Sequence, residues 1–167
     1  LMEAGATLGI ADAGYYALEA MRVEKGYRAW GRELNPDTNP YEAGLGFAVK
    51  LGKSVDFIGR KALLEAKTTP PRRRCVSLVA KPQDAPLLHG GELVMRDGKP
   101  VGEVTSAAFG AALDRPVMLA YVATDGVPLT REALARSAYT VDVGGITVPV
   151  TATLEAPFDP ANARLTA

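Results

Sequence analysis

The stretch Tyr139–Leu154, YTVDVGGITVPVTATL, decides the fold of the second half of the chain. Tyr139, Val141 and Val143 alternate with polar residues, so they lie on one face of a strand. The glycine pair at 144–145 supplies a tight turn, and apolar residues alternate again beyond it. This pattern predicts a hairpin of two antiparallel strands, each with one buried face.

Other segments of the second half repeat this signal. Gly91–Ser106 (GELVMRDGKPVGEVTS) has apolar residues on both sides of Asp97-Gly98, which predicts a second hairpin. Cys75–Ala80 and Val117–Ala123 are short and rich in valine and leucine, as buried strands are. Several short strands separated by glycine or proline turns predict a small antiparallel barrel or sandwich.

The first part of the chain has helical rather than alternating patterns. A helix is expected between Asp12, a candidate N-cap, and Gly26, a residue type at which helices end. A second helical pattern covers Asp56–Lys67. Residues 27–44 contain several Asn, Asp and Pro residues and predict a loop, whereas Leu45–Leu51 (LGFAVKL) predicts a buried strand.

A proline pair at 70–71 marks the clearest boundary in the chain, because proline ends helices. The pattern changes there from helices and loops to alternating strands. The sequence therefore predicts an α+β fold, with a partial mixed α/β domain over residues 1–70 and an antiparallel β domain over residues 71–167.

The composition is that of an ordinary globular protein, and it excludes several kinds of partner. Of 167 residues, 19 are Lys or Arg and 19 are Asp or Glu, so no net charge attracts nucleic acid or an acidic membrane. Cys75 is the only cysteine, which excludes an internal disulfide and a cysteine-based zinc site. A lone cysteine suits a reducing compartment such as the cytosol or the mitochondrial matrix, and of these we predict a cytoplasmic location. No apolar run reaches the roughly 20 residues of a membrane helix.

The first residues, LMEAGATLGIADAG, lack the basic region and the apolar core of a signal peptide. The chain starts at Leu1, and the residues after it resemble the lead-in to a helix. We therefore expect a piece of a longer protein, the alternative being a natural start at Met2.

Few residues carry a recognisable chemistry, and the sequence assigns no catalytic or metal-binding residue. His89 lies beside a glycine pair without a second ligand or nucleophile pattern, so we interpret it as a loop histidine. Ser106 lacks the context of a Ser/His/acid triad. The run Arg72–Arg74 fits a phosphate site or, more commonly, a solvated linker.

Aromatic side chains in the first quarter of the chain form the best candidate for a binding surface. Together with nearby carboxylates they can hold a flat heterocycle by stacking and paired hydrogen bonds, and the alternative is packing at a domain interface. The aromatic members are Tyr15, Tyr16, Tyr27, Trp30 and Tyr41, and the acidic members are Glu24, Glu33, Asp37 and Glu42.

A series of short motifs runs through nearly the whole chain in a fixed order. They are MRVEK at Met21–Lys25, then RAWG, DTNPYEAGL, DFIGRKAL, DGKPVGEVTSAAFG and MLAYV, and the terminal segment Glu155–Pro160. With these motifs the chain resembles the later part of the folate-binding aminomethyltransferase module of the glycine-cleavage T-protein family. The sequence of Ala17–Leu63 is similar to that of the module copy fused to flavin-dependent dimethylglycine and sarcosine dehydrogenases.

The resemblance implies a fold and an activity. The family fold is a three-part cloverleaf, of which this chain would hold the end of the folate-binding α/β domain (residues 1–70) and the whole C-terminal β-barrel (residues 71–167). In the implied activity, a methylated amine is oxidised to an iminium at FAD in an upstream flavin domain, which is absent here. Tetrahydrofolate bound in the module captures the one-carbon unit as 5,10-methylenetetrahydrofolate. The pocket has to be shielded because an iminium hydrolyses in water.

The resemblance also indicates what this chain lacks and which residues it contributes. The family's catalytic Asp and pterin-binding Glu come from the first half of the module, so the chain is expected to be inactive alone. T-proteins carry an arginine at the position of Leu18, and its absence favours the dehydrogenase branch. The expected cofactor-binding residues are Arg22, Tyr27, Trp30 and Arg164, the last near a substrate-contacting tyrosine of T-proteins.

The resemblance also predicts how the segment Tyr27–Pro40 is used. It is expected to follow the helix that backs the folate pocket, with Trp30 packed under or beside that pocket. Arg22 and Glu24 are expected to join a buried ion-pair lattice that supports the site without taking part in chemistry.

Two other interpretations stay open: a non-catalytic β-barrel docking domain, and a stand-alone relative of the T-protein. A truncated α/β domain exposes the apolar face that its missing half would cover, so a homodimer through residues 1–70 is also expected. No nucleic-acid or membrane partner is expected.

Overall fold

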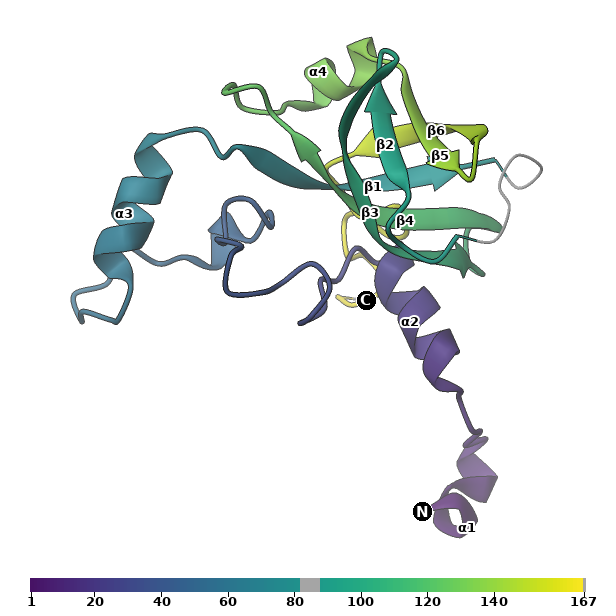
Figure 1. The fold of residues 1–167 in the computed structure, drawn as a ribbon. Coiled ribbons are helices and arrows are strands. Elements are labelled where there is room, and N and C mark those ends of the chain that lie inside the picture. Colours follow the sequence, from purple (N-terminus) through teal and green to yellow (C-terminus); the bar gives the residue numbers. More distant parts are fainter. Residues whose placement is uncertain (82–87, 167) are drawn as a thin grey trace.

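The computed structural model describes residues 1–81 and 88–166, and a six-stranded antiparallel barrel dominates it (Figure 1). The strands follow one another around the barrel in the order β1-β4-β3-β2-β5-β6, and β6 pairs with β1 to close it. The α+β fold is confirmed, and of the two predicted β architectures the barrel is the one that forms. The strands are β1 Arg73–Ala80, β2 Leu93–Arg96, β3 Lys99–Gly110, β4 Arg115–Ala123, β5 Tyr139–Val143 and β6 Ile146–Thr153.

Alternating apolar side chains from every strand fill the barrel, because the interior of so small a barrel has room only for side chains. The helix α4, Arg131–Arg136, adds Leu134 to this core, and Thr130 caps α4 by accepting a hydrogen bond from the Ala133 amide. The strand residues buried in the core are Val76, Leu78, Ala80, Val94, Val104, Met118, Ala120, Val122, Tyr139, Val141 and Val148.

Both predicted hairpins are confirmed. Asp97 and Gly98 join β2 to β3, and the glycine pair at 144–145 joins β5 to β6. All four residues have positive φ, as two-residue hairpin turns with this handedness require. The turn chemistry in the sequence therefore sets the register of both hairpins.

Strand β3 is irregular in the middle. Val104 pairs with Ala120 and Ser106 pairs with Leu119, so Thr105 is an extra residue in a β-bulge. Two positions earlier in the ladder, a Cβ on Gly102 would lie 1.8 Å from the Tyr121 carbonyl oxygen, so only glycine fits there. The bulge and the close approach together shape the face that β3 turns toward the first part of the chain.

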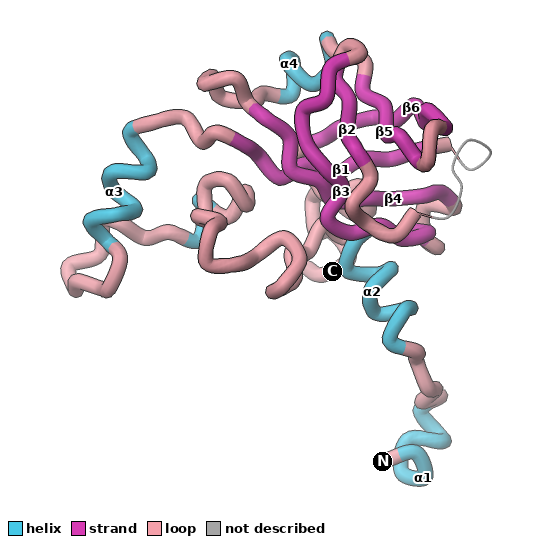
Figure 2. The backbone as a smooth tube through the Cα atoms, viewed as in Figure 1, coloured by secondary structure: helices cyan, strands magenta, loops and turns pink. Residues whose placement is uncertain are grey.

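The first 70 residues run outside the barrel as short helices and loops, as Figure 2 shows. Their helical elements are α1 Met2–Gly5, α2 Tyr15–Glu24, α3 Arg60–Thr68 and the 3₁₀ turns η1 Ala6–Leu8 and η2 Gly46–Ala48. None of the helices among the described residues is long and apolar enough to cross a membrane.

Two local predictions in this part were wrong. The N-cap of α2 is Gly14 rather than Asp12, and it makes no side-chain capping bond. Leu45–Leu51 forms no strand and contains only the turn η2. Its backbone groups are used locally, because the Ala48 amide donates to the Leu45 carbonyl at 3.0 Å and thereby closes the turn.

Contacts of several kinds attach the first part to the outside of the barrel and to the segment after β6. Val23 of α2 is fully buried against Val117 and Leu119 of β4. The loop over residues 27–44 lies along β1, where the Cys75 amide donates to the Glu42 carbonyl at 2.8 Å. The segment after β6 returns to the end of α2 and is hydrogen-bonded to it.

Candidate functional site

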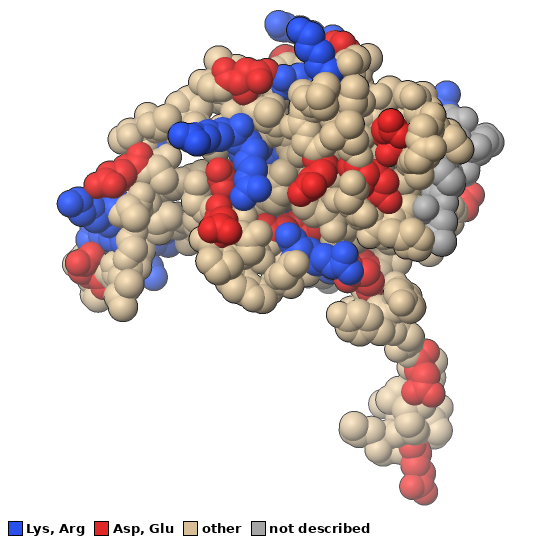
Figure 3. All heavy atoms as spheres, in the orientation of Figure 1, with Lys and Arg blue, Asp and Glu red and all other residues tan. Residues whose placement is uncertain are grey.

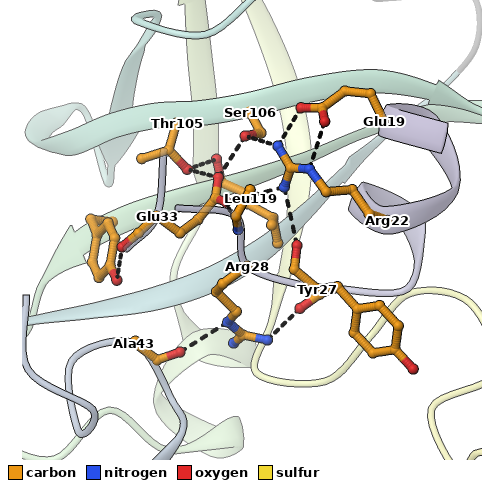
Figure 4. A network of polar contacts seen from close by, with 12 residues as sticks. Glu19, Arg22, Tyr27, Arg28, Glu33, Ala43, Thr105, Ser106 and Leu119 are labelled. Atoms are coloured by element: carbon orange, nitrogen blue, oxygen red, sulfur yellow. Dashed lines mark hydrogen bonds and ion pairs between the residues drawn. The ribbon is translucent and has the colours of Figure 1, made fainter. Parts of the chain in front are cut away.

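A buried carboxylate, Glu33, lies where the loop, helix α2 and strand β3 meet (Figure 4). Its side chain is 0% exposed. The Oε1 atom of Glu33 accepts hydrogen bonds from the Thr105 hydroxyl at 2.7 Å and the Ser106 hydroxyl at 2.6 Å. The Oε2 atom accepts from Arg22 Nη1 at 3.1 Å and from the Ala29 amide at 2.9 Å. A carboxylate buried away from solvent needs hydrogen-bond donors in place of water, and Glu33 has four of them.

Arg22 is the cation of the network. Its guanidinium donates to both oxygens of Glu19, to Glu33 Oε2, to the Ser106 hydroxyl at 2.7 Å and to the Tyr27 carbonyl at 3.0 Å. These contacts use all five N–H groups that an arginine possesses. Arg22 therefore holds parts of this chain together and has no free donor left for a ligand.

The electrostatics agree with the geometry. The hydrogen bond from Arg22 lowers the pKa of Glu19 below its ordinary value, although partial burial opposes the shift. Burial acts against the charged form of Arg22, but its bonds to Glu19 and the charge of Glu33 outweigh this and raise the pKa of Arg22. Both groups are therefore held in their charged forms.

A second set of arginines closes the loop on itself and fastens it to β1. Arg28 Nε donates to the Ala43 carbonyl at 2.9 Å, and Arg74 Nη1 donates to the Tyr41 carbonyl. The guanidinium of Arg73 lies 4.6 Å from the centre of the Tyr121 ring. The interpretation of Arg72–Arg74 as a solvated linker is therefore wrong for its last two residues, which contact the loop or the barrel.

Burial between the loop and β1 also shifts the pKa values of two side chains of β1. Burial raises the pKa of the Cys75 thiol to about 11. Burial, followed by the nearby charge of Arg28, lowers the pKa of Arg74. The thiol is fully buried and stays protonated at neutral pH, so it is unreactive unless the loop moves away.

The two aromatic residues expected at the site are exposed rather than packed. Trp30 is 75% exposed and Tyr27 is 53% exposed. In Figure 4 the Tyr27 ring points away from the network, while its carbonyl oxygen faces Arg22. No part of the described chain covers the Trp30 ring closely, and its expected place under or beside the folate pocket stays a prediction.

Arg164 lies apart from the Arg22 network. Its guanidinium is 5.1 Å from the centre of the Phe158 ring. The Phe158 amide donates to the Glu24 carbonyl at 2.9 Å, and Lys25 Nζ pairs with Asp159 Oδ2 at 2.9 Å. These bonds hold the segment after β6 against the end of α2.

Sequence reasoning predicted a buried ion-pair lattice but named the wrong carboxylate. Glu24 is buried, yet its Oε2 accepts from the Ala112 amide at 3.2 Å and does not pair with Arg22. The partners of Arg22 are Glu19 and Glu33. Successive helix positions point in different directions, and the Arg22 and Glu24 side chains, two residues apart, do not face each other.

Apolar side chains of the first part are exposed in unusual number. They lie on the helices, the 3₁₀ turns and the connecting loops from Leu1 to α3. Exposed apolar surface of this extent is typical of a site of contact or ligand binding. Members exposed by more than two fifths are Leu1, Met2, Leu8, Ile10, Tyr15, Tyr16, Leu18, Met21, Tyr27, Trp30, Phe47, Val55, Ile58 and Leu64. Charged side chains of both signs are interspersed over the face seen in Figure 3.

Other candidates carry less chemistry. His89 is exposed, as expected for a loop histidine, and its backbone amide donates to Glu92 Oε1 at 2.7 Å. Among residues 1–81 and 88–166, no group of three or more His, Cys, Asp or Glu residues is placed to hold a metal ion.

Comparison with known proteins covers both parts of the chain. Residues 1–53 match the GCVT N-terminal domain, and residues 73–159 match the glycine cleavage T-protein C-terminal barrel domain. The chain is 38% identical over 166 residues to the mitochondrial sarcosine dehydrogenase of Homo sapiens. It is 46% identical over 122 residues to the mitochondrial dimethylglycine dehydrogenase of Mus musculus.

Each of these matches covers most of this chain but only a minor part of the longer relative. The alignment with the sarcosine dehydrogenase includes 99% of this chain but only 18% of the relative, and that with the dimethylglycine dehydrogenase 73% and 14%. The solved structure of aminomethyltransferase T of the glycine cleavage system from Bartonella henselae superposes with a TM-score of 0.67 at 31% identity. That superposition covers 85% of this chain and 38% of the other.

Proposed function

This chain belongs to the glycine cleavage T-protein family, and from that premise we propose that it is the C-terminal portion of a tetrahydrofolate-dependent aminomethyltransferase-type module in a flavin-dependent dimethylglycine or sarcosine dehydrogenase. The observation that carries the proposal is the order of the two family matches along one chain, residues 1–53 and then 73–159. Residues 1–70 would end the folate-binding α/β domain, and residues 71–167 would form the barrel domain.

Tetrahydrofolate, when bound, supplies the nucleophilic nitrogen that captures the one-carbon unit of an iminium produced at FAD in the upstream flavin domain. This chain contributes a wall of the folate site. The exposed rings of Tyr27 and Trp30 fit a flat ligand, because each ring leaves a face free for stacking.

Arg22 serves the same site in a different way. All five of its N–H groups are engaged within the chain, so it positions the backbone of Tyr27 rather than reaching for folate itself. Arg164, held over Phe158 at the end of α2, is proposed as a contact for the outer part of the folate molecule. An arginine suits this role because the glutamate end of folate carries carboxylates.

The apolar surface of the first part supports the same assignment. Side chains such as Phe47 and Ile58 are largely exposed in this chain, whereas a folate pocket has to exclude water. We propose that the preceding part of the module covers this surface in the complete protein. Where that part is missing, a second copy of the chain would cover it as a homodimer through residues 1–70. The predicted cytoplasmic location stays a prediction, since the named relatives are mitochondrial.

The test uses the complete protein with dimethylglycine or sarcosine as donor. Two quantities are followed: the rate of flavin reduction, and the division of the one-carbon product between 5,10-methylenetetrahydrofolate and formaldehyde. Replacing Trp30 or Tyr27 by alanine is expected to weaken tetrahydrofolate binding about tenfold, which is the loss of one good stacking contact. More formaldehyde then forms, while flavin reduction stays at the wild-type rate.

Phe109→Ala is the matched control, because Phe109 is also 53% exposed but lies on the barrel strand β3. Equal loss of flavin reduction and folate capture in the Trp30 and Tyr27 variants would contradict the assignment, as would no loss of either. A wild-type protein that forms only formaldehyde, with or without tetrahydrofolate, would favour a non-catalytic docking domain.

A further inference from the structure

Glu33 has four hydrogen-bond donors, and they come from three separate parts of the chain. Arg22 belongs to α2, the Ala29 amide belongs to the loop over residues 27–44, and the two hydroxyls of Thr105 and Ser106 belong to β3. The main-chain carbonyl of Glu33 makes a further hydrogen bond, to a fourth part of the chain, because it accepts from the Tyr121 hydroxyl of β4 at 2.9 Å. One residue thus joins the helix, the loop and the barrel.

The β-bulge explains how two neighbouring hydroxyls reach one carboxylate. In a regular strand the side chains of Thr105 and Ser106 would point to opposite faces. The extra residue at Thr105 interrupts this alternation, and both hydroxyl oxygens lie within 2.7 Å of Glu33 Oε1. The Thr-Ser pair of the hairpin motif is therefore an anchoring device and needs no catalytic partner.

The same network holds the backbone on both sides of residue 28. Arg22 Nη1 binds the Tyr27 carbonyl at 3.0 Å, and Glu33 Oε2 binds the Ala29 amide at 2.9 Å. Trp30 follows directly. The direction in which Tyr27 and Trp30 leave the surface of the chain therefore depends on these two bonds.

We infer that Glu33 is a positioning residue, which the bulge at Thr105 ties to the barrel and which fixes the loop so that Tyr27 and Trp30 present their rings to folate. This inference rests on the proposed function. It adds that the site is set from the barrel side, through a carboxylate that touches neither folate nor the reacting atoms.

A carboxylate suits this position because it accepts from all four neighbouring groups and balances part of the charge of Arg22. Glutamine in its place would present one oxygen and one NH₂ group to the same four groups. Its oxygen could still accept from Arg22 and the Ala29 amide while its NH₂ group faces the two hydroxyls, which accept as well as donate. What it removes is the negative charge, so Arg22 would lose one of its two counter-ions. Glu33→Gln is therefore the most direct variant, and Thr105→Val is a milder one that keeps the shape of the side chain.

The experiment measures two properties of each variant in the complete protein. The first is the dissociation constant for tetrahydrofolate, obtained by titration. The second is the rate at which iodoacetamide alkylates Cys75, read from the mass of the peptide that contains it. Cys75 is fully buried, and its amide binds the Glu42 carbonyl, so alkylation reports on movement of the loop.

Glu33→Gln and Thr105→Val are each expected to raise the dissociation constant about tenfold, as for a lost hydrogen bond to a charged group, and to speed Cys75 alkylation by a similar factor. Thr105→Ser keeps the hydroxyl and is expected to match the wild type in both. Ser77→Ala is the control for a general loss of stability, because Ser77 is also buried on β1 but lies outside the network.

The outcomes separate this inference from the proposed function. Faster alkylation of Cys75 with an unchanged dissociation constant would overturn the positioning role. Wild-type behaviour of Thr105→Val in both measurements, or equal effects of Thr105→Val and Thr105→Ser, would overturn the anchoring role of the hydroxyl. A wild-type protein that does not bind tetrahydrofolate would instead overturn the proposed function, while the alkylation rates would still decide whether Glu33 anchors the loop.

Discussion

The barrel and the first 70 residues are stabilised in opposite ways. Each barrel strand is paired on both sides, and the apolar side chains between them form one continuous core. In the first part, the buried hydrophobic residues are only Val23 and Ala43 among those described, and much of its order comes from bonds to the barrel. One region holds itself together, and the other is held in place by polar contacts. Substitutions in each region can test this difference.

The largest effect is expected from truncating side chains in the barrel core. Leu78 is fully buried, so Leu78→Ala should lower the free energy of unfolding by about 3 kcal/mol through lost burial and a cavity. Ile58→Ala, in the first part, should change it by less than about 0.5 kcal/mol, because Ile58 is fully exposed. Urea unfolding followed by circular dichroism measures both. A large effect of Ile58→Ala would mean that its surface is already covered.

A somewhat smaller effect is expected at Gly102. A Cβ at this position would meet the Tyr121 carbonyl oxygen at 1.8 Å, so Gly102→Ala has to push β3 and β4 apart. We expect a loss of about 2 kcal/mol, as for overpacking in a core. Gly52→Ala is the control in the first part, because its Cβ would meet nothing within 4 Å. Equal melting temperatures for the two variants would contradict the crowding argument.

The smallest effect is a pH dependence confined to the first part. The hydrogen bond from Arg22 lowers the pKa of Glu19 in the folded chain. The stability that this bond provides is therefore complete above the ordinary glutamate pKa of about 4.3 and is lost as the pH falls through the lower, folded value. The loss should be about 0.5 kcal/mol, as for an ion pair three residues apart on a helix.

Hydrogen exchange of α2 amides between pH 3 and pH 6 measures this loss, with the strands β5 and β6 as an internal reference. Glu19→Gln should remove the dependence, and Glu3→Gln, on the exposed helix α1, should leave it unchanged. An equal response of the barrel strands to pH would show that the two regions do not differ in the way proposed.

How much the sequence predicts follows the same division. The strands and hairpins of the barrel were predicted correctly, because alternation and turn residues such as Asp97-Gly98 are local signals. Leu45–Leu51 was predicted as a strand and is not one, since an apolar run becomes a strand only where a neighbouring strand completes its hydrogen bonds. The order of motifs in the chain led to the right family.

The site could be predicted only in outline. Glu33 and Ser106 are 73 residues apart in the chain, and no periodic pattern connects them. The sequence indicated that Arg22 would be paired within a buried lattice, but its partner lies in a loop whose path depends on the barrel. The exposure of Trp30 had no local signal either, because aromatic residues occur both in cores and at contact surfaces.

The register of β3 has a consequence at the level of the gene. Val104 and Ser106 already pair with the adjacent residues Ala120 and Leu119, so loss of the codon for Thr105 would leave a continuous, regular ladder. Such an in-frame deletion would spare the barrel and remove one of the ties to Glu33. Loss of a codon in the uninterrupted stretch Leu119–Val122 of β4 would instead turn every later side chain of that strand to the opposite face. Two deletions of equal length would thus have very different severity, and only the first would produce a folded protein with a loosened loop.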